Sequence, residues 1–450
     1  MNRRYFLNTL FTSALSSIVL EKTYGQSPGQ KSIVFLHMNG GPSQIDLFDY
    51  KEELYRKNGK SINYFKSEKG QIGGTLLKPI STFKKRGESG IWVSDLLPNI
   101  SKHVDQMTII HSLSVTSLNH YDAQLEQFTG TTNLGGIHVG HWINDYLYKN
   151  NKLHTNIPNF ILMHDELGEI RSFPDITDLG LNTSPKSFIS FSTLDSLRVN
   201  LNNIAYSGND SSFFINLLSK LNKNSSSTLS KKRLDSLKLV LESKNTLIKT
   251  LSKIKYDYRI KRIYGVSKEG ENSYVDQLLF AKELIKLGIP LIQINSGDTD
   301  DASSWDHHFK LSDLNKMCSK IDLATSGFIK DLQESHLLQK SAIFWGGEFG
   351  RLPIIDEKGA PENSKEQGRG HNNLASTCWI IDDGVKKGHI YGETDEIGLK
   401  TVSNKVHYGD IWATLLYLIN IDHRDLKIKE ADTIKTFTKK SDQIIKNILT

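Results

Sequence analysis

Residues 31–43 read KSIVFLHMNGGPS, an apolar run that stops at a turn-forming Asn-Gly-Gly-Pro sequence. A short apolar run bounded by turn residues is typical of a buried strand. The pattern recurs in PLIQINSG at residues 290–297 and in SAIFWGG at residues 341–347. Each of these follows a stretch with helical spacing of its apolar side chains, at residues 276–287 and 311–338. The sequence therefore predicts an α/β fold with a mostly parallel central sheet.

Polar side chains follow the predicted strands. Asp46 and Asp49 come after the first strand, Asp306 and His308 after the second, and Glu348 and Arg351 after the third. A further strand is expected at residues 377–381, TCWII. In open parallel sheets, ligands bind beyond the carboxyl ends of the strands. We therefore expect the functional site at that edge.

The chain is expected to form one main domain, over residues 30–450. Between residues 207 and 262 the composition shifts to Ser, Asn, Lys and Leu, with leucines at helical intervals. This segment is interpreted as a helical insertion or cap within the domain.

The first 25 residues are interpreted as a targeting segment. Arg3 and Arg4 precede an uncharged apolar run at residues 9–20, and Glu21 begins a polar stretch. This resembles a twin-arginine export signal, which predicts a periplasmic or extracellular protein. The run is too short for a stable membrane span, which needs about 20 residues. A frayed amphipathic helix is the alternative.

The composition describes a folded globular chain of 450 residues, with 38% hydrophobic and 24% charged residues. The 56 basic and 50 acidic residues give a net charge of +6 that is spread along the chain, so a nucleic-acid partner is not implied. The two cysteines, Cys318 and Cys378, are too few for a Cys-rich zinc site. Any metal would need histidine and carboxylate ligands, and the chain has 15 histidines.

Several motifs occur together in one order: GGPSQIDLFDYK at 40–51, WDHH at 305–308, GEFGR at 347–351, GRGH at 368–371 and GHIYGETDEIG at 388–398. With these motifs the chain resembles the DUF1501 family of exported bacterial proteins over nearly its whole length after residue 30. That family is placed by similarity in the alkaline phosphatase and sulfatase superfamily. The resemblance implies a central sheet with helices on both faces and a site for one or two metal ions.

The resemblance also implies a ligand set. Asp306 and His308, with the later His371, match a metal-binding Asp, His and His of the superfamily phosphatases. Glu348 stands where those enzymes have an Asp, and Asp46 is the nearest carboxylate after the first strand. Zinc or manganese is favoured for such a set, with calcium and magnesium as the other candidates.

The expected nucleophile position departs from the sulfatase pattern. Sulfatases carry it nine residues before a Thr-Gly pair, and counting back from Thr129-Gly130 gives His120 instead of Cys or Ser. Formylglycine chemistry therefore lacks its cysteine. His120 is assigned as ligand, general base or nucleophile. Arg351 and Arg369 suit an anionic ester, because a guanidinium can clamp phosphate or sulfate oxygens.

Each assignment has a structural alternative. Asp306 and Asp46 can cap helices, and His120 can cap the helix that follows it. Glu348 can form an ion pair with Arg351, and Arg369 can pair with Asp356. His371 can be a loop histidine bonded to the backbone.

Two classes of function remain open from the sequence. One is an exported metal-dependent hydrolase of sulfate or phosphate esters, including those of a sulfated or phosphorylated glycan, that uses metal-activated water or His120-assisted attack. The other is a non-catalytic envelope or glycan-binding protein on a degenerate sulfatase-like fold. The sequence does not fix the oligomeric state.

Overall fold

The structure is a computed structural model. It describes residues 30–67, 70–132, 136–150, 157–164, 188–191, 194–195, 197–198, 243, 245–297, 304–356, 366–430 and 433–450. The predicted export signal at residues 1–25, and residues 207–242 of the predicted insertion, lie outside these ranges.

The described residues form an eight-stranded sheet with the order β14-β6-β13-β10-β1-β9-β7-β8. Its strands are β1 (Ser32–Met38), β6 (Thr108–Leu113), β7 (Phe160–His164), β8 (Phe188–Phe191), β9 (Leu291–Ser296), β10 (Ser341–Gly346), β13 (Ser376–Ile381) and β14 (His389–Tyr391). Strand β13 is antiparallel to both of its neighbours, and the other pairings are parallel. The predicted mostly parallel sheet is therefore confirmed, and the antiparallel strand β13 makes it a mixed sheet.

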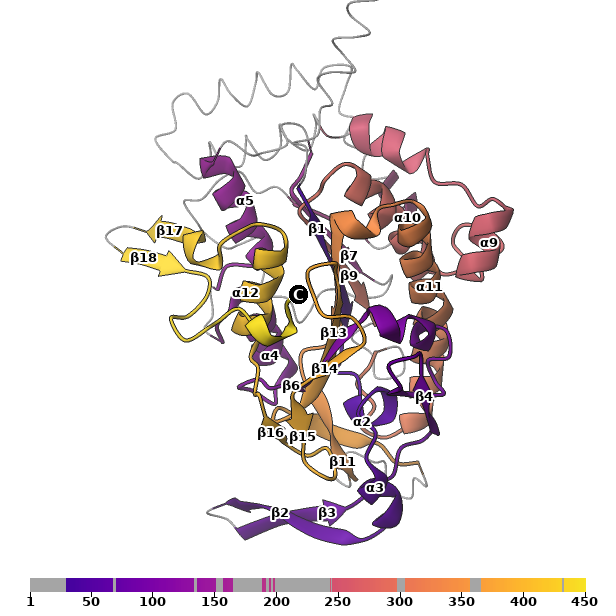
Figure 1. Cartoon of the computed structure of the whole chain (residues 1–450), viewed down its shortest axis with the longest axis vertical. Coiled ribbons are helices and arrows are strands. Elements are labelled where there is room, and N and C mark those ends of the chain that lie inside the picture. Colours follow the sequence, from indigo (N-terminus) through magenta and orange to yellow (C-terminus); the bar gives the residue numbers. More distant parts are fainter. Residues whose placement is uncertain are drawn as a thin grey trace, which may run out of the picture.

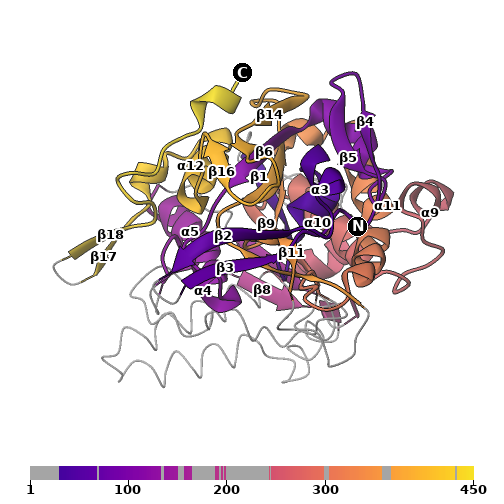
Figure 2. The same ribbon diagram turned by 90° about the horizontal axis from the view of Figure 1, so that it is seen from below.

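Strand β1 lies at the centre of the sheet, between β9 and β10. Both of its faces are buried, because its side chains alternate between two hydrophobic clusters. Val34 and Leu36 pack with the cluster that includes α10 and α11, whereas Ile33 and Phe35 pack with the cluster that includes α4, α5 and α12. Figures 1 and 2 show these two helix layers on opposite sides of the sheet. Helices cover both faces, as predicted.

Helices among the described residues include α2 (Gln44–Leu47), α3 (Glu52–Arg56), α4 (His120–Thr129), α5 (Val139–Lys149), α9 (Tyr258–Tyr264), α10 (Ser273–Lys286), α11 (Leu314–Glu334) and α12 (Tyr408–Leu418). Helix α10 precedes β9, and helix α11 precedes β10 with a short 3-10 helix at Leu338–Lys340 between them, which confirms the predicted helix-to-strand steps. Among the described residues, no helix is long and apolar enough to cross a membrane.

The described residues also form five two-stranded ribbons outside the central sheet. They pair β2 (Ser61–Ser67) with β3 (Gly70–Thr75), β4 (Phe83–Arg86) with β5 (Ile91–Ser94), β11 (Gly350–Ile355) with β12 (Arg369–Asn372), β15 (Glu393–Thr394) with β16 (Thr401–Ser403), and β17 (Lys427–Glu430) with β18 (Thr433–Thr436). The β11-β12 ribbon matters most here, because Arg351 lies opposite His371 in its register. Figure 2 shows the molecule from the side on which β11 lies.

Candidate metal centre

Three chain segments bring four polar side chains together near the carboxyl ends of the central strands. His120 is the first residue of α4, whose N-cap is Asn119: the Asn119 side chain accepts a hydrogen bond from the backbone N–H of Tyr121. Asp306 and His308 lie in the loop that follows β9. His371 lies on β12. The sequence also predicts a site at this edge, because loops after parallel strands converge there.

His120, Asp306, His308 and His371 each offer one ligand atom, and these atoms all lie within 4.8 Å of one another. The Asp306 carboxylate is at the centre. Its Oδ1 is 2.9 Å from Nε2 of His308 and 3.2 Å from Nε2 of His371, and its Oδ2 is 3.2 Å from Nε2 of His120. We call these four residues the histidine cluster. The structure thus gathers four of the side chains that the sequence singled out.

Each histidine of the cluster is held through its other ring nitrogen. Nδ1 of His371 lies 2.7 Å from the carbonyl oxygen of Leu118, and Nδ1 of His308 lies 2.6 Å from Oδ2 of Asp356. Nδ1 of His120 lies 2.5 Å from Oε1 of Glu348. A carbonyl oxygen only accepts, and an ionised carboxylate only accepts, so each Nδ1 carries the hydrogen. In the neutral imidazoles, the lone pairs are therefore on Nε2.

In this tautomer the lone pairs of two Nε2 atoms face each other, and a cation between them would remove their repulsion. Nε2 of His308 and Nε2 of His371 are only 2.8 Å apart, yet both would present lone pairs. Two lone pairs at this separation repel each other unless a proton or a metal ion lies between the rings. Histidine metal ligands generally donate their second N–H to a carboxylate or carbonyl, as all three histidines do here. The residues present therefore fit a metal ion.

The electrostatics favour positive charge on His120 and His308, whereas burial and the charges of Arg351 and His120 lower the pKa of His371. Burial lowers the pKa of His120, but hydrogen bonds and charges from Asp306 and Glu348 outweigh it and raise the pKa to about 9. Burial alone would raise the pKa of Asp306, but Arg351 and the three histidines hold it well below its usual range. Asp306 therefore stays ionised, as a metal ligand must. A site that binds a proton on His120 this strongly attracts a divalent cation for the same reason.

Glu348 lies behind His120, outside the four-residue cluster. Its side chain is fully buried, accepts hydrogen bonds from the backbone N–H of Gly40 at 3.0 and 3.2 Å, and lies 3.6 Å from Nε2 of His37. Burial would raise the pKa of Glu348, but His120 and His37 outweigh it and hold the pKa below its usual range. The structure places the predicted ligand Glu348 as the group that orients His120.

Arg351 is buried beneath the cluster. Its Nε donates to the carbonyl of Gly41 at 2.8 Å, its Nη1 donates to the carbonyl of Arg369 at 3.1 Å, and its Nη2 pairs with Asp306. The sequence predicts that Arg351 clamps an anionic ester. Instead, the structure engages its donors with protein acceptors and pairs it with Asp306, not with Glu348.

Asp46 and Arg369 form a separate, fully buried ion pair. Nε of Arg369 lies 2.7 Å from Oδ2 of Asp46, and its remaining donors reach the carbonyls of Leu77 and Lys78 at 3.1 Å. The structure thus does not bring Asp46 to the histidine cluster, where the sequence predicts a ligand. Arg369 is likewise closed to an ester, because its side chain is fully buried.

Two partners of the cluster were not assigned this role from the sequence. Asp356 follows β11 and was considered only as a partner for an arginine, whereas it orients His308. The carbonyl of Leu118 is invisible to motif reasoning, since a backbone oxygen carries no residue signature. His37, at the end of β1, offered a detectable signal: a histidine within an otherwise apolar strand.

The family model for DUF1501, described as a protein of unknown function, matches residues 30–449. The chain belongs to the DUF1501 family. The predicted family membership is therefore confirmed. Among curated proteins, no match was found for this DUF1501 protein.

Several solved structures resemble this DUF1501 protein at low sequence identity. The lipoteichoic acid synthase LtaP from Listeria monocytogenes is 11% identical over 92% of this chain and 76% of its own, with a TM-score of 0.40. A protein of the alkaline phosphatase superfamily from Vibrio parahaemolyticus is 11% identical over the same shares, with a TM-score of 0.39. The PsFucS1 sulfatase from Pseudoalteromonas sp. is 11% identical over 89% of this chain and 69% of its own, with a TM-score of 0.34.

Proposed function

We propose that this DUF1501 protein is an exported metal-dependent hydrolase of phosphate or sulfate esters. One observation carries the proposal: three imidazoles, each held through Nδ1, direct their Nε2 atoms toward the Asp306 carboxylate. The export part rests on Arg3, Arg4 and the apolar run that follows them.

The histidine cluster would hold the metal ion. Three nitrogen donors and one carboxylate suit zinc or manganese better than calcium or magnesium, which prefer sets of oxygen ligands. Such an ion, when bound, polarises an ester oxygen and lowers the pKa of water. The four side chains retain between 17% and 26% of their exposure, so a substrate can reach them from solvent.

The residues around the cluster would set its geometry and charge. Arg351 holds Asp306 in place and keeps it ionised, while Glu348 fixes the ring of His120. With Nδ1 donating to Glu348 and Nε2 acting as a ligand, His120 has no lone pair left for attack. We therefore favour water over His120 as the attacking group, and we assign His120 to the ligand set.

A second function is favoured by one observation. The two arginines expected to clamp an ester, Arg351 and Arg369, are both buried and bonded to protein acceptors. A non-catalytic glycan-binding protein that kept a metal for stability would not need a free guanidinium at the site.

Metal content and hydrolysis together test the proposal. We expect the purified protein to carry about one equivalent of zinc or manganese, and His371→Gln to weaken metal binding by at least 10–100-fold, the usual loss for an outer-shell partner. His389→Gln, the same change on β14 outside the cluster, should keep the metal. The readouts are elemental analysis and hydrolysis of p-nitrophenyl phosphate and p-nitrophenyl sulfate.

Two results would decide against this proposal. Equal metal content in the His371→Gln and unmodified proteins would show that the histidine cluster is not the metal site. Stoichiometric metal with no hydrolysis of either ester would favour the binding-protein alternative.

A further inference from the structure

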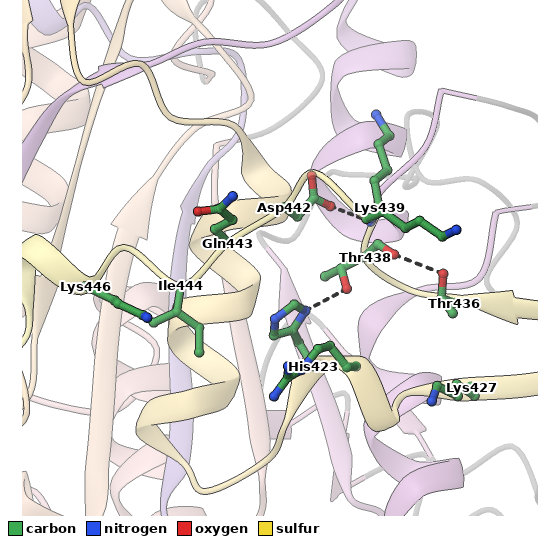
Figure 3. A pocket seen from close by; sticks show the side chains of 11 residues that line it. His423, Lys427, Thr436, Thr438, Lys439, Asp442, Gln443, Ile444 and Lys446 are labelled. Atoms are coloured by element: carbon green, nitrogen blue, oxygen red, sulfur yellow. Dashed lines mark hydrogen bonds between the residues drawn. The ribbon is translucent and has the colours of Figure 1, made fainter.

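A cavity lies in the C-terminal part of the chain, away from the histidine cluster. Its volume is about 550 Å³, and residues from His423 to Lys446 line it. None of the lining residues belongs to the histidine cluster. Figure 3 shows its wall, with Lys427 and Lys446 on opposite sides. The cavity is thus a candidate site separate from the metal centre.

The wall of this cavity is strongly basic. It contains Lys427, Lys439, Lys440, Lys446 and Arg424, and Asp442 is its one carboxylate. Across the whole chain, by contrast, 56 basic residues face 50 acidic ones. The positive charge is therefore concentrated at the cavity and raises the local concentration of anions.

The four lysines are also free to bind a ligand. Within the part of the chain that the structure describes, none of their ammonium groups has an acidic partner, whereas Arg424 pairs with Asp422 at 2.7 Å. The Asp442 carboxylate is already used, since it accepts a hydrogen bond from the backbone N–H of Lys439 at 2.6 Å.

Part of the cavity lining consists of polar groups held by hydrogen bonds to one another. Nδ1 of the buried His423 lies 2.8 Å from the hydroxyl of Thr438, and the hydroxyl of Thr436 donates to the carbonyl of Thr438 at 3.0 Å (Figure 3). The lining includes no Phe, Tyr or Trp. A nucleobase would lack the aromatic platform on which bases usually stack. Beside the aliphatic side chain of Ile444, the contacts that this cavity offers a ligand are charge and hydrogen bonds.

We propose that this cavity binds a ligand with closely spaced phosphate or sulfate groups. Ammonium groups and hydroxyls are donors that such oxyanions accept, and charge-assisted hydrogen bonds are the strong ones. Lysines on opposite walls suit several anionic groups better than one. An oligophosphate and a multiply sulfated oligosaccharide share this chemistry. The site is independent of the proposed hydrolase activity.

Calorimetric titration of the full-length protein tests the site. The titrations use the His371→Gln variant, so that the metal centre contributes little to binding. The probes are tripolyphosphate, a disulfated disaccharide, inorganic phosphate and vesicles of anionic phospholipid. We expect one of the first two to bind at least about tenfold more tightly than inorganic phosphate, and binding to weaken with added salt. The probe that binds identifies phosphate or sulfate as the recognised group.

A matched pair of triple variants localises the binding. Changing Lys427, Lys439 and Lys446 to Gln should weaken binding by about tenfold or more. Changing Lys249, Lys253 and Lys255 to Gln removes the same charge from exposed lysines outside the cavity and should leave binding unchanged. All six lysines are exposed, so both variants should unfold at the temperature of the parent.

Three outcomes would overturn the site. The two triple variants could weaken binding equally, which would indicate a general charge effect. Inorganic phosphate could bind as tightly as the larger probes. Finally, binding could be confined to vesicles of anionic phospholipid, with neither soluble probe bound, which would make the patch a membrane-contact surface.

Discussion

At the scale of single residues, the identity of the group on each Nδ1 sets what the histidine cluster can bind. The carboxylates of Glu348 and Asp356 hold two rings, and a backbone carbonyl holds the third. A carboxylate acceptor raises the basicity of the opposite ring nitrogen more than a neutral carbonyl does. His120 and His308 should therefore be the stronger donors to a metal, and His371 the weaker one.

Asp356→Asn tests this ordering. The amide can still accept the Nδ1 hydrogen of His308, but it carries no charge. We expect zinc affinity to fall by about 10-fold, or about 1.4 kcal/mol, with the fold intact. Competition with a chromophoric chelator measures the affinity. Asp383→Asn, at an exposed surface pair with Lys387, is the control and should leave zinc affinity unchanged. An unchanged zinc affinity in Asp356→Asn would show that the Asp356 carboxylate only packs against the imidazole ring of His308.

The sequence identified the loops of the site better than the partners within it. Asp306 and His308 were selected because polar residues after parallel strands share one edge, and His371 was selected through the family resemblance. Which carboxylate pairs with which cation depends on distances that motif spacing does not contain. Asp46 therefore looked like a ligand but pairs with Arg369, and Asp356 looked like an arginine partner but orients His308.

At the scale of elements, the turn after β1 packs against the loop that carries Asp306 and holds it in position. Gly40 and Gly41 have φ values of +112° and +74°. The carbonyl of Asn39 accepts a hydrogen bond from the N–H of Trp305 at 2.9 Å, which joins this turn to the loop that carries Asp306. A Cβ added at Gly40 would lie 2.6 Å from the backbone nitrogen of Asp306. The absence of a side chain at Gly40 is thus what lets the two loops meet.

Gly40→Ala should therefore displace the Asp306 loop and weaken metal binding. Gly59→Ala is the matched control, because Gly59 has a φ of +77° but nothing within 4 Å of an added Cβ. Left-handed backbone costs an L-residue about 1–2 kcal/mol, so both variants should lose stability. Only Gly40→Ala should also lose metal affinity. Urea unfolding and chelator competition measure the two effects, and equal metal affinity in both variants would contradict the coupling.

The strands and helices themselves were accessible from the sequence. The runs at 31–38, 290–297, 341–347 and 377–381 became β1, β9, β10 and β13, because an apolar run with turn residues at its ends has few other solutions. The antiparallel direction of β13 was not predicted, since a strand buried on both faces looks the same in either direction.

At the scale of the whole molecule, buried histidines outside the histidine cluster make the stability of the folded chain depend on pH. His103 packs against α11, where its Nε2 lies 2.9 Å from the hydroxyl of Ser326, and burial lowers its pKa from 6.5 to about 4. Burial likewise lowers the pKa of His111 and His138. These groups stay neutral in the folded chain at pH values where the unfolded chain binds protons.

The sign of the pH effect follows from this difference. Between pH 6.5 and pH 4 the unfolded chain holds a proton on His103 that the folded chain excludes, so acidification through this window favours unfolding. We expect a loss on the order of 1 kcal/mol per pH unit from this residue. His103→Asn should unfold more easily at pH 7 but lose less stability on acidification to pH 5. His336→Asn, at an exposed position, should keep the pH dependence of the parent. Urea unfolding at both pH values measures this, and an undiminished pH dependence in His103→Asn would assign the acid sensitivity to other buried groups.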